Sequence, residues 1–373
     1  MNYYLMDGNE ALARGAFAAG CRFFAGYPIT PASTIFDTLF QLIPPAGGIC
    51  MQGEDEIASI GYCLGASMAG MKAMTATSGP GISLYSEQIS FAIASEIPIV
   101  IVDVQRLGPS TGSATRGADG DIQFLRWGNS GGLPVIVLAP VDVRDCFVLT
   151  MHAFNLAERF RCPVFIASNK EIALTRESID EKDLSPIPIE TRSAPSDADR
   201  FLPFHIPEGR MTPGFFPIGG EVIVRQTSST HGQDGYITTN PEEIQKNQIR
   251  LLNKIESFVD DVTVYDFFPS EDADTLMISY GVTARAALSA VSQLSPSIKK
   301  PSLLILKTLW PVPEKIIREK ARQMETIFVV EMNMGQYRRE IERILPGKRV
   351  RWLGRMDGNL ISPRTIAEVL NHE

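Results

Sequence analysis

The sequence predicts an α/β protein with two domains, the first of which is built on a doubly wound parallel sheet. Three observations support this fold class. The chain has 373 residues, which is more than one hydrophobic core usually organises. Short apolar runs alternate with segments of helical periodicity, an order typical of parallel strands joined by helices. A proline-rich stretch interrupts the alternation, which then resumes and predicts a second, smaller α/β domain.

The first domain is expected to contain six short apolar strands separated by helices. The expected strands are 23–25, 49–52, 73–77, 97–104, 135–139 and 164–167. The expected helices are 7–20, 34–42, 56–70, 85–96 and 145–159. Asp7 is expected to cap the first helix, because its carboxylate is suited to accept hydrogen bonds from free backbone amides.

The alternation resumes near the C-terminus with fewer elements. Strands are expected at 275–279, 303–307 and 326–331, and helices at 249–258, 284–294, 313–323 and 337–345. We therefore divide the chain into a first domain at 1–183, a proline-rich linker or insertion at 184–248, and a second domain at 249–373.

The charge and the apolar pattern of the chain argue against several classes of partner. The net charge of −8 disfavours nucleic acid and anionic membranes, because both favour a basic surface. No apolar stretch reaches the roughly 18–20 residues that span a bilayer. The N-terminus also lacks the basic and apolar regions of a signal peptide. We expect a cytoplasmic protein that binds neither nucleic acid nor membrane.

Metal and cluster signatures are missing from the sequence. The five cysteines form no CxxC pair, and the four histidines show no HxH or HExxH spacing. We therefore expect no iron–sulfur cluster, zinc ion or other metal held by this chain alone. A Walker-type phosphate loop is absent as well.

Two turns follow expected strands and precede expected helices. The motif GYPITPAS (26–33) contains Pro28 and Pro31, which restrict their own backbone and bias the preceding residues toward extended geometry. The motif SGPG begins at Ser78, and its glycines allow a close approach of backbone to a ligand. Taken alone, SGPG is explained equally well as a simple strand–helix turn, and for GYPITPAS taken alone a simple turn is the safer interpretation.

Three adjacent acids, Glu54, Asp55 and Glu56, lie at the end of another expected strand. Acids at a helix N-terminus are favoured by the helix dipole, and this explains Asp55 and Glu56 taken alone. The alternative is a carboxylate placed at the carboxyl ends of parallel strands, where such folds bind ligands.

The order of glutamate, Ala/Gly-rich helix, strand and TSGPG resembles the pyrimidine-binding domain of thiamine-diphosphate enzymes. Glu54 and Ser78 lie 24 positions apart, the spacing that members of this superfamily show, and this selects Glu54 over Glu56. The resemblance implies that Glu54 hydrogen-bonds the aminopyrimidine ring and activates the cofactor. The second domain would then resemble the transketolase C-terminal domain.

Further motifs narrow the resemblance to one family. GYPITPAS, GEDEIASI, TATSGPG, VDVQRLGPSTG, HGQDGYITTNPE, LKTLWPVPE and VVEMNMGQ occur in this order. Together they resemble the α subunit of 2-oxoacid:ferredoxin oxidoreductases, most closely the 2-oxoglutarate type. The resemblance implies oxidative decarboxylation of a 2-oxoacid to acyl-CoA and CO₂, with reduction of ferredoxin.

The resemblance also assigns roles to individual residues. It implies catalytic roles for Glu54, Arg106 and Thr30, and cofactor contacts for Glu54, Ser78, Gly79, Pro28 and Ile29. The substrate would be held by Thr30, Arg106, Ser110, Thr111 and Arg116. A guanidinium such as that of Arg106 suits a 2-oxoacid because it binds a carboxylate bidentately. Arg116 stands where 2-oxoglutarate enzymes often carry lysine, and a surface charge is the alternative explanation for it.

The family's Mg²⁺ and diphosphate motif, GDG followed by Asn, is missing from this chain. The segment ADGDIQ (118–123) resembles it superficially, but no matching Asn follows, and we interpret the segment as a helix cap. The resemblance therefore implies a β subunit that supplies Mg²⁺, the diphosphate site and a [4Fe-4S] cluster. A γ-type subunit, ferredoxin and coenzyme A complete the expected partners.

Several alternatives stay open at this point. The substrate is pyruvate, a branched-chain 2-oxoacid or an aryl 2-oxoacid in related enzymes. A non-redox thiamine-diphosphate decarboxylase or transketolase-like subunit shares the same half-site. A scaffold subunit with a vestigial pocket is the third alternative.

Overall fold

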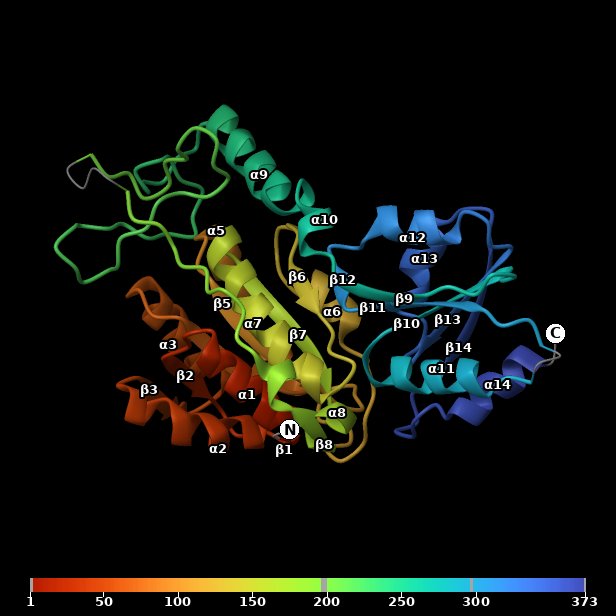
Figure 1. Cartoon of the computed structure of the whole chain (residues 1–373). Helices are drawn as coiled ribbons and strands as arrows, with labels where there is room; N and C mark the ends of the chain where they lie inside the picture. The colour runs from red at the N-terminus through yellow and green to blue at the C-terminus, as the bar shows by residue number, and fades with distance from the viewer. Residues whose placement is uncertain (1–2, 196–199, 296–297, 372–373) are drawn as a thin grey trace.

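The structure is a computed structural model that describes residues 3–195, 200–295 and 298–371. Figure 1 shows two sheets side by side, with the N-terminal elements at one end and the C-terminal elements at the other. Helix α9 (Pro241–Glu256) passes along one side of the molecule, from the irregular loops toward the second sheet.

The first sheet has seven strands in the order β12-β6-β7-β5-β4-β2-β3. Its strands are β2 (Phe23–Gly26), β3 (Ile49–Gln52), β4 (Ala73–Thr77), β5 (Ile99–Gln105), β6 (Ile136–Leu138), β7 (Pro163–Asn169) and β12 (Thr308–Trp310). All neighbours are parallel except β12, which runs antiparallel to β6. From β2 the chain adds β3 on one side, and it then adds β4, β5 and the later strands on the other, so the chain order reverses between β2 and β4. The predicted doubly wound parallel sheet is confirmed.

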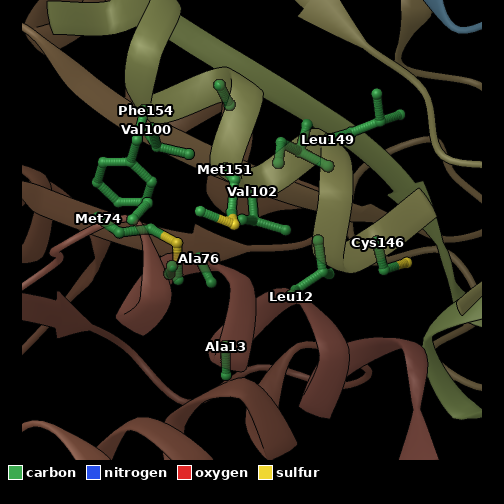
Figure 2. Close-up of a cluster of buried hydrophobic side chains, with 14 of the residues drawn as sticks. Leu12, Ala13, Met74, Ala76, Val100, Val102, Cys146, Leu149, Met151 and Phe154 are labelled. Carbon is green, nitrogen blue, oxygen red and sulfur yellow. The ribbon is translucent and has the colours of Figure 1, made fainter. Parts of the chain in front are cut away.

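Helices cover both faces of this sheet. One face carries α1 (Gly8–Ala18), α2 (Ser33–Leu42) and α7 (Val143–Phe160), and the other carries α3 (Glu56–Met68), α4 (Pro80–Leu84), α5 (Ser86–Ala94) and α6 (Ile122–Trp127). Figure 2 shows Leu12 of α1 and Leu149 of α7 beside Val102 of β5 in the first of these layers. Asp7 caps α1 as predicted, accepting a 2.9 Å bond from the amide of Glu10.

The second sheet has five strands in the order β14-β13-β10-β11-β9. They are β9 (Tyr265–Phe268), β10 (Thr275–Ser279), β11 (Ser302–Leu306), β13 (Thr326–Glu331) and β14 (Arg349–Gly354). Helices α11 (Gly281–Gln293) and α14 (Pro363–Asn371) pack on one face, and α12 (Glu314–Ala321) and α13 (Arg338–Ile344) on the other. Side chains of α12 and α13 join a core that continues into the first sheet, so the two sheets share buried apolar surface.

Several elements were not predicted from the sequence. They are the antiparallel pair β1 (Tyr3–Asp7) and β8 (Arg176–Asp180), the strands β9, β12 and β14, and the helices α8 (Lys170–Leu174), α10 (Val259–Val262) and α14, with short 3₁₀ turns at Pro44–Ala46 and Glu181–Leu184. The helix expected at 85–96 begins at Pro80 and is divided at Tyr85 into α4 and α5. Among the described residues, no helix combines the length and apolar character that crossing a membrane requires.

The described part of 185–240 contains no helix or strand but is packed against the first sheet's helices. The guanidinium of Arg192 bonds Glu158 and the carbonyls of Ser67 and Met71, and it stacks 4.1 Å from the ring of Phe215. Helix α9 begins at Pro241, inside the segment predicted as linker or insertion, because Asn240 caps it. The division of the chain at 183 and 248 stays a prediction.

A buried ion cluster attaches α9 to the first sheet. The carboxylate of Glu96 is fully buried and accepts from Arg250 at 2.6 Å and from Lys254 at 2.9 Å. Burial opposes ionisation of Glu96, but Lys254 and Arg250 outweigh burial and lower its pKa to about 2. Lys254 is itself only 1% exposed, so its charge depends on Glu96 for compensation.

The substitution Glu96→Gln should lower the free energy of unfolding by about 3–5 kcal/mol, because it leaves buried cations unpaired. The wild-type protein should lose this contribution as the pH falls from 4.5, the ordinary value for glutamate, toward about 2. Urea unfolding at several pH values measures both effects.

The matched control is Glu368→Gln, which removes a solvent-exposed partner of Arg364 on α14. This control should leave stability unchanged. A Glu96→Gln protein as stable as the wild type would contradict the assigned role of the cluster.

Candidate active site

Four neighbouring strands end at one edge of the first sheet and bring the predicted residues together. Strands β5, β4, β2 and β3 are parallel and adjacent in this order. Their carboxyl ends therefore carry Arg106, the SGPG turn, the YPITP turn and Glu54, respectively. This edge includes the point where the chain order reverses, the usual ligand-binding position in open α/β sheets.

Arg106 ties two of these segments together. It is 4% exposed, and its guanidinium donates to the carbonyl of Thr30 at 2.5 Å and to that of Thr111 at 2.9 Å. These bonds use two of the five N–H donors of a guanidinium. In this structure Arg106 therefore fixes the backbone of the YPITP turn against the following loop, with its charge buried at the sheet edge.

The SGPG turn lies directly against Arg106. Gly79 has φ +53°, and a Cβ at this position would lie 2.8 Å from Nε of Arg106. Glycine is required here both by the backbone conformation and by this approach. The side-chain oxygens of Thr77 and Ser78 and Nε of Arg106 are buried without a described hydrogen-bond partner. The turn thus holds polar groups that protein contacts do not satisfy.

The three acids of GEDEIASI have different surroundings. Asp55 caps α3, accepting a 2.7 Å bond from the amide of Ala58, which is the structural role considered for it from sequence. Glu56 is buried beneath Gly81. Glu54 is exposed, and its carboxylate accepts a 3.1 Å bond from the hydroxyl of Tyr62. This hydrogen bond raises the pKa of Tyr62. Glu54 thus presents an exposed carboxylate at the edge, and the Glu56 carboxylate lies against the SGPG turn.

The loop 107–117 after Arg106 carries the remaining predicted residues. Ser110, which has φ +55°, and Thr111 are exposed at its tip. The loop closes on itself through a 2.8 Å bond from the amide of Leu107 to the carbonyl of Arg116. The exposed side chain of Arg116 lies against Gly358, which belongs to the part of the chain built on the second sheet (the second lobe). A Cβ added at Gly358 would lie 2.7 Å from the Cβ of Arg116.

The YPITP turn has a support that sequence reasoning missed. Nδ2 of Asn9, on the buried face of α1, donates at 2.8 Å to both the carbonyl of Pro31 and the hydroxyl of Thr34. The Thr30–Pro31 peptide is cis, while Pro28, Ile29 and the Thr30 side chain are at least partly exposed. A polar residue on the otherwise apolar face of α1 was the available signal for Asn9.

The segment ADGDIQ does precede a helix, but Asp121 does not cap it. Helix α6 begins at Ile122, and the Asp121 side chain accepts no hydrogen bond from its first amides. The interpretation as a helix cap is therefore wrong for this side chain, which faces the buried carboxyl of Asp103 instead.

These residues fit one half of a thiamine-diphosphate site. An exposed carboxylate, a glycine turn with unsatisfied hydroxyls and a fixed cation suit the aminopyrimidine side and an anionic substrate. The described residues contain no group of three or more His, Cys, Asp or Glu arranged to hold a metal ion. His372 lies outside them.

Comparison with known proteins decides the family. A family described as "Pyruvate flavodoxin/ferredoxin oxidoreductase, thiamine diP-bdg" matches residues 14–250, and "Pyruvate:ferredoxin oxidoreductase core domain II" matches residues 273–366. The chain belongs to the 2-oxoacid:ferredoxin oxidoreductase family. The resemblance inferred from the sequence motifs is thereby confirmed.

Two relatives within this family are similar to the chain over nearly its whole length. "2-oxoglutarate synthase subunit KorA" of Methanothermobacter marburgensis is 40% identical over 368 residues, 97% of each chain. "Ketoisovalerate oxidoreductase subunit VorB" of the same organism is 34% identical, covering 97% of this chain and 95% of that one.

A solved structure of the family has the same fold. It is described as "2-oxoglutarate:ferredoxin oxidoreductase from Magnetococcus marinus with 2-oxoglutarate, coenzyme A and succinyl-CoA bound", and it matches with a TM-score of 0.93 at 31% identity. The match covers 99% of this chain but 65% of that longer one. The present chain is thus similar to about two thirds of the solved oxidoreductase chain.

Proposed function

We propose that this chain is the α subunit of a 2-oxoglutarate:ferredoxin oxidoreductase that forms acyl-CoA and CO₂ and works only with a β subunit. One observation carries the proposal. Glu54, the SGPG turn, Thr30 and Arg106 meet at a single sheet edge, with an exposed carboxylate and a buried cation. The names of its 2-oxoglutarate relatives support the substrate.

The cofactor half supplied by this chain is the aminopyrimidine side. When bound, thiamine diphosphate supplies the electron sink for loss of CO₂ from a 2-oxoacid. Glu54 would share a proton with the aminopyrimidine ring, while Ser78 and Gly79 of the one turn and Pro28 and Ile29 of the other would line it. The Tyr62 hydroxyl holds the Glu54 carboxylate in place at 3.1 Å.

The substrate would lie between the YPITP turn and the loop 107–117. Arg106 provides fixed positive charge near the 2-oxoacid carboxylate, and the hydroxyls of Thr30, Ser110 and Thr111 surround it. Arg116 is the exposed cation of this loop, and we assign it to the distal carboxylate of 2-oxoglutarate.

Other groups must come from partners. We propose that the β subunit holds Mg²⁺, the diphosphate and a [4Fe-4S] cluster, and that a γ-type subunit, ferredoxin and coenzyme A complete the reaction. The cytoplasmic location stays a prediction. A branched-chain 2-oxoacid is the second candidate substrate, favoured by the similarity to the ketoisovalerate relative.

The substitution Glu54→Gln should reduce turnover of the α/β complex by about 10²–10⁴-fold, because an amide does not exchange a proton with the cofactor. Ferredoxin or viologen reduction with 2-oxoglutarate and coenzyme A measures the effect. The matched control is Glu181→Gln, since Glu181 also accepts a tyrosine hydroxyl bond, from Tyr4 at 3.2 Å. Near-normal turnover in the Glu54 variant would contradict the assignment.

The substitution Arg116→Ala should raise KM for 2-oxoglutarate by about 10–100-fold, the value of one charge-assisted hydrogen bond to a carboxylate. KM for pyruvate, which lacks the distal carboxylate, should change little. Exposed Arg364 on α14 provides the control substitution Arg364→Ala. Equal increases for the two substrates would show that Arg116 does not bind the distal carboxylate.

A further inference from the structure

A pair of acids lies directly behind the active-site arginine. Asp103 is on β5, three residues before Arg106, and is fully buried. Neither of its carboxyl oxygens receives a hydrogen bond from a described N–H or hydroxyl group, and Oδ2 of Asp121 is equally unpartnered. The group that faces the Asp103 carboxyl at hydrogen-bonding range is the Asp121 carboxyl.

Two carboxylates repel each other and have no proton with which to hydrogen-bond. Contact between two buried carboxyls therefore requires that one of them is protonated. Burial, followed by the charge of Asp121, raises the pKa of Asp103 well above its usual range. Burial also raises the pKa of Asp121, but its hydrogen bond with Asp103 and the charge of Arg106 oppose this rise. The two carboxyls thus hold one proton between them.

The other charged groups around the pair agree with a single negative charge. Arg106 is the cation that acts on both carboxyls. Burial raises the pKa of the nearby Asp119 to about 7; the charges of Glu331 and Asp121 add to this rise, and the Asn169 amide, which donates to Asp119 at 2.8 Å, opposes it. One proton held between Asp103 and Asp121 leaves one buried carboxylate opposite one buried guanidinium.

Asp121 follows the C-terminal end of the substrate loop 107–117. Residues of both the first and the second lobe hydrogen-bond the segment 119–121. The Asp121 amide donates to the side chain of Gln105 on β5 at 3.0 Å. From the second lobe, the Asn333 side chain donates to the carbonyl of Asp119 at 2.9 Å. Asp119 in turn donates its amide to the carbonyl of Met332 at 2.9 Å. The Asp103–Asp121 contact closes this arrangement beside Arg106.

We propose that Asp103 and Asp121 share one proton and that this pair is a positioning device, which fixes the substrate loop 107–117 and thereby places Arg106 and Arg116 for the 2-oxoacid. The proposal rests on the proposed function for its substrate. Neither acid touches substrate in this account. Both act through the loop and through the guanidinium of Arg106.

The test compares Asp103→Asn with Asp103→Leu in the complete enzyme complex. The asparagine amide still donates to Asp121, so this variant should keep KM for 2-oxoglutarate within about twofold. Leucine removes the donor and leaves Asp121 buried and unpaired, so KM should rise about tenfold or more while kcat changes less. Equal effects of the two variants would overturn the proposal.

The pH dependence of KM distinguishes a shared proton from a simple packing role, because a packing role would not change with pH. In the wild type, the shared proton is lost as the pH rises, the two carboxylates repel each other, and KM should increase. The asparagine amide does not titrate, so Asp103→Asn should flatten this increase. An unchanged alkaline rise in that variant would overturn the proposal even if the leucine variant failed to fold.

Two measurements test the shared proton without measuring enzyme activity. Their outcome is therefore independent of whether the proposed function is correct. Infrared spectra of the complex with ¹³C-labelled aspartate should show protonated carboxyl bands at neutral pH, one of which Asp103→Asn removes and the control Asp274→Asn, at the partner of Lys299, leaves in place. Hydrogen exchange at the amides of Leu107, Ser113 and Asp121 should accelerate in Asp103→Leu and not in Asp103→Asn. If both results are obtained but the complex oxidises no 2-oxoacid, the shared proton stands and the proposed function is wrong. Absence of the band would overturn the shared proton.

Discussion

The hydrogen bonds from the Arg106 guanidinium to the carbonyls of Thr30 and Thr111 are the contact on which the candidate active-site edge depends. They join a turn after β2 to a loop after β5, segments that are separated by the intervening strand β4. Because the guanidinium is buried and rigid, it fixes the distance between the two segments before any substrate binds. Gly79 allows this by leaving room beside Nε.

This fixed edge is supported from both sides by buried polar groups. Asn9 holds the YPITP turn from the helix layer beneath it. On the other side, the segment 118–123 is held by β5 and by residues that follow β13, so the domain built on the second sheet helps to place the loop 107–117. Strand β12 adds a further connection, since it leaves the second lobe to complete the first sheet. The two lobes therefore act as one support for the site.

Much of this architecture could be predicted from the sequence because it follows from local patterns. The strands at 73–77, 275–279 and 326–331 were predicted with their observed limits, since each is a short apolar run bounded by turn residues. Parallel order then places the ends of neighbouring strands at one edge, which is why Glu54, Ser78 and Arg106 were expected together. Strands β1, β8 and β12 were missed because their pairing partners are far away in the sequence.

In the site, too, local patterns could be predicted from the sequence and long-range contacts could not. A role for Asn9 or for the Asp103–Asp121 pair depends on contacts between segments that no local pattern connects. The available signal for Asp103 was a charged residue inside the apolar strand IVIVDVQ, where every residue is buried. The superficial likeness of ADGDIQ to a metal motif drew attention to Asp121, but its partner could be identified only once the two segments lay side by side.

The central claim is that this chain supplies one half of a cofactor site. Isothermal titration of thiamine diphosphate with Mg²⁺ into the α chain alone, the β subunit alone and the α/β complex tests it most directly. We expect tight, saturable binding by the complex and none of comparable affinity by the α chain alone. Binding by the α chain alone with the affinity of the complex would contradict the account.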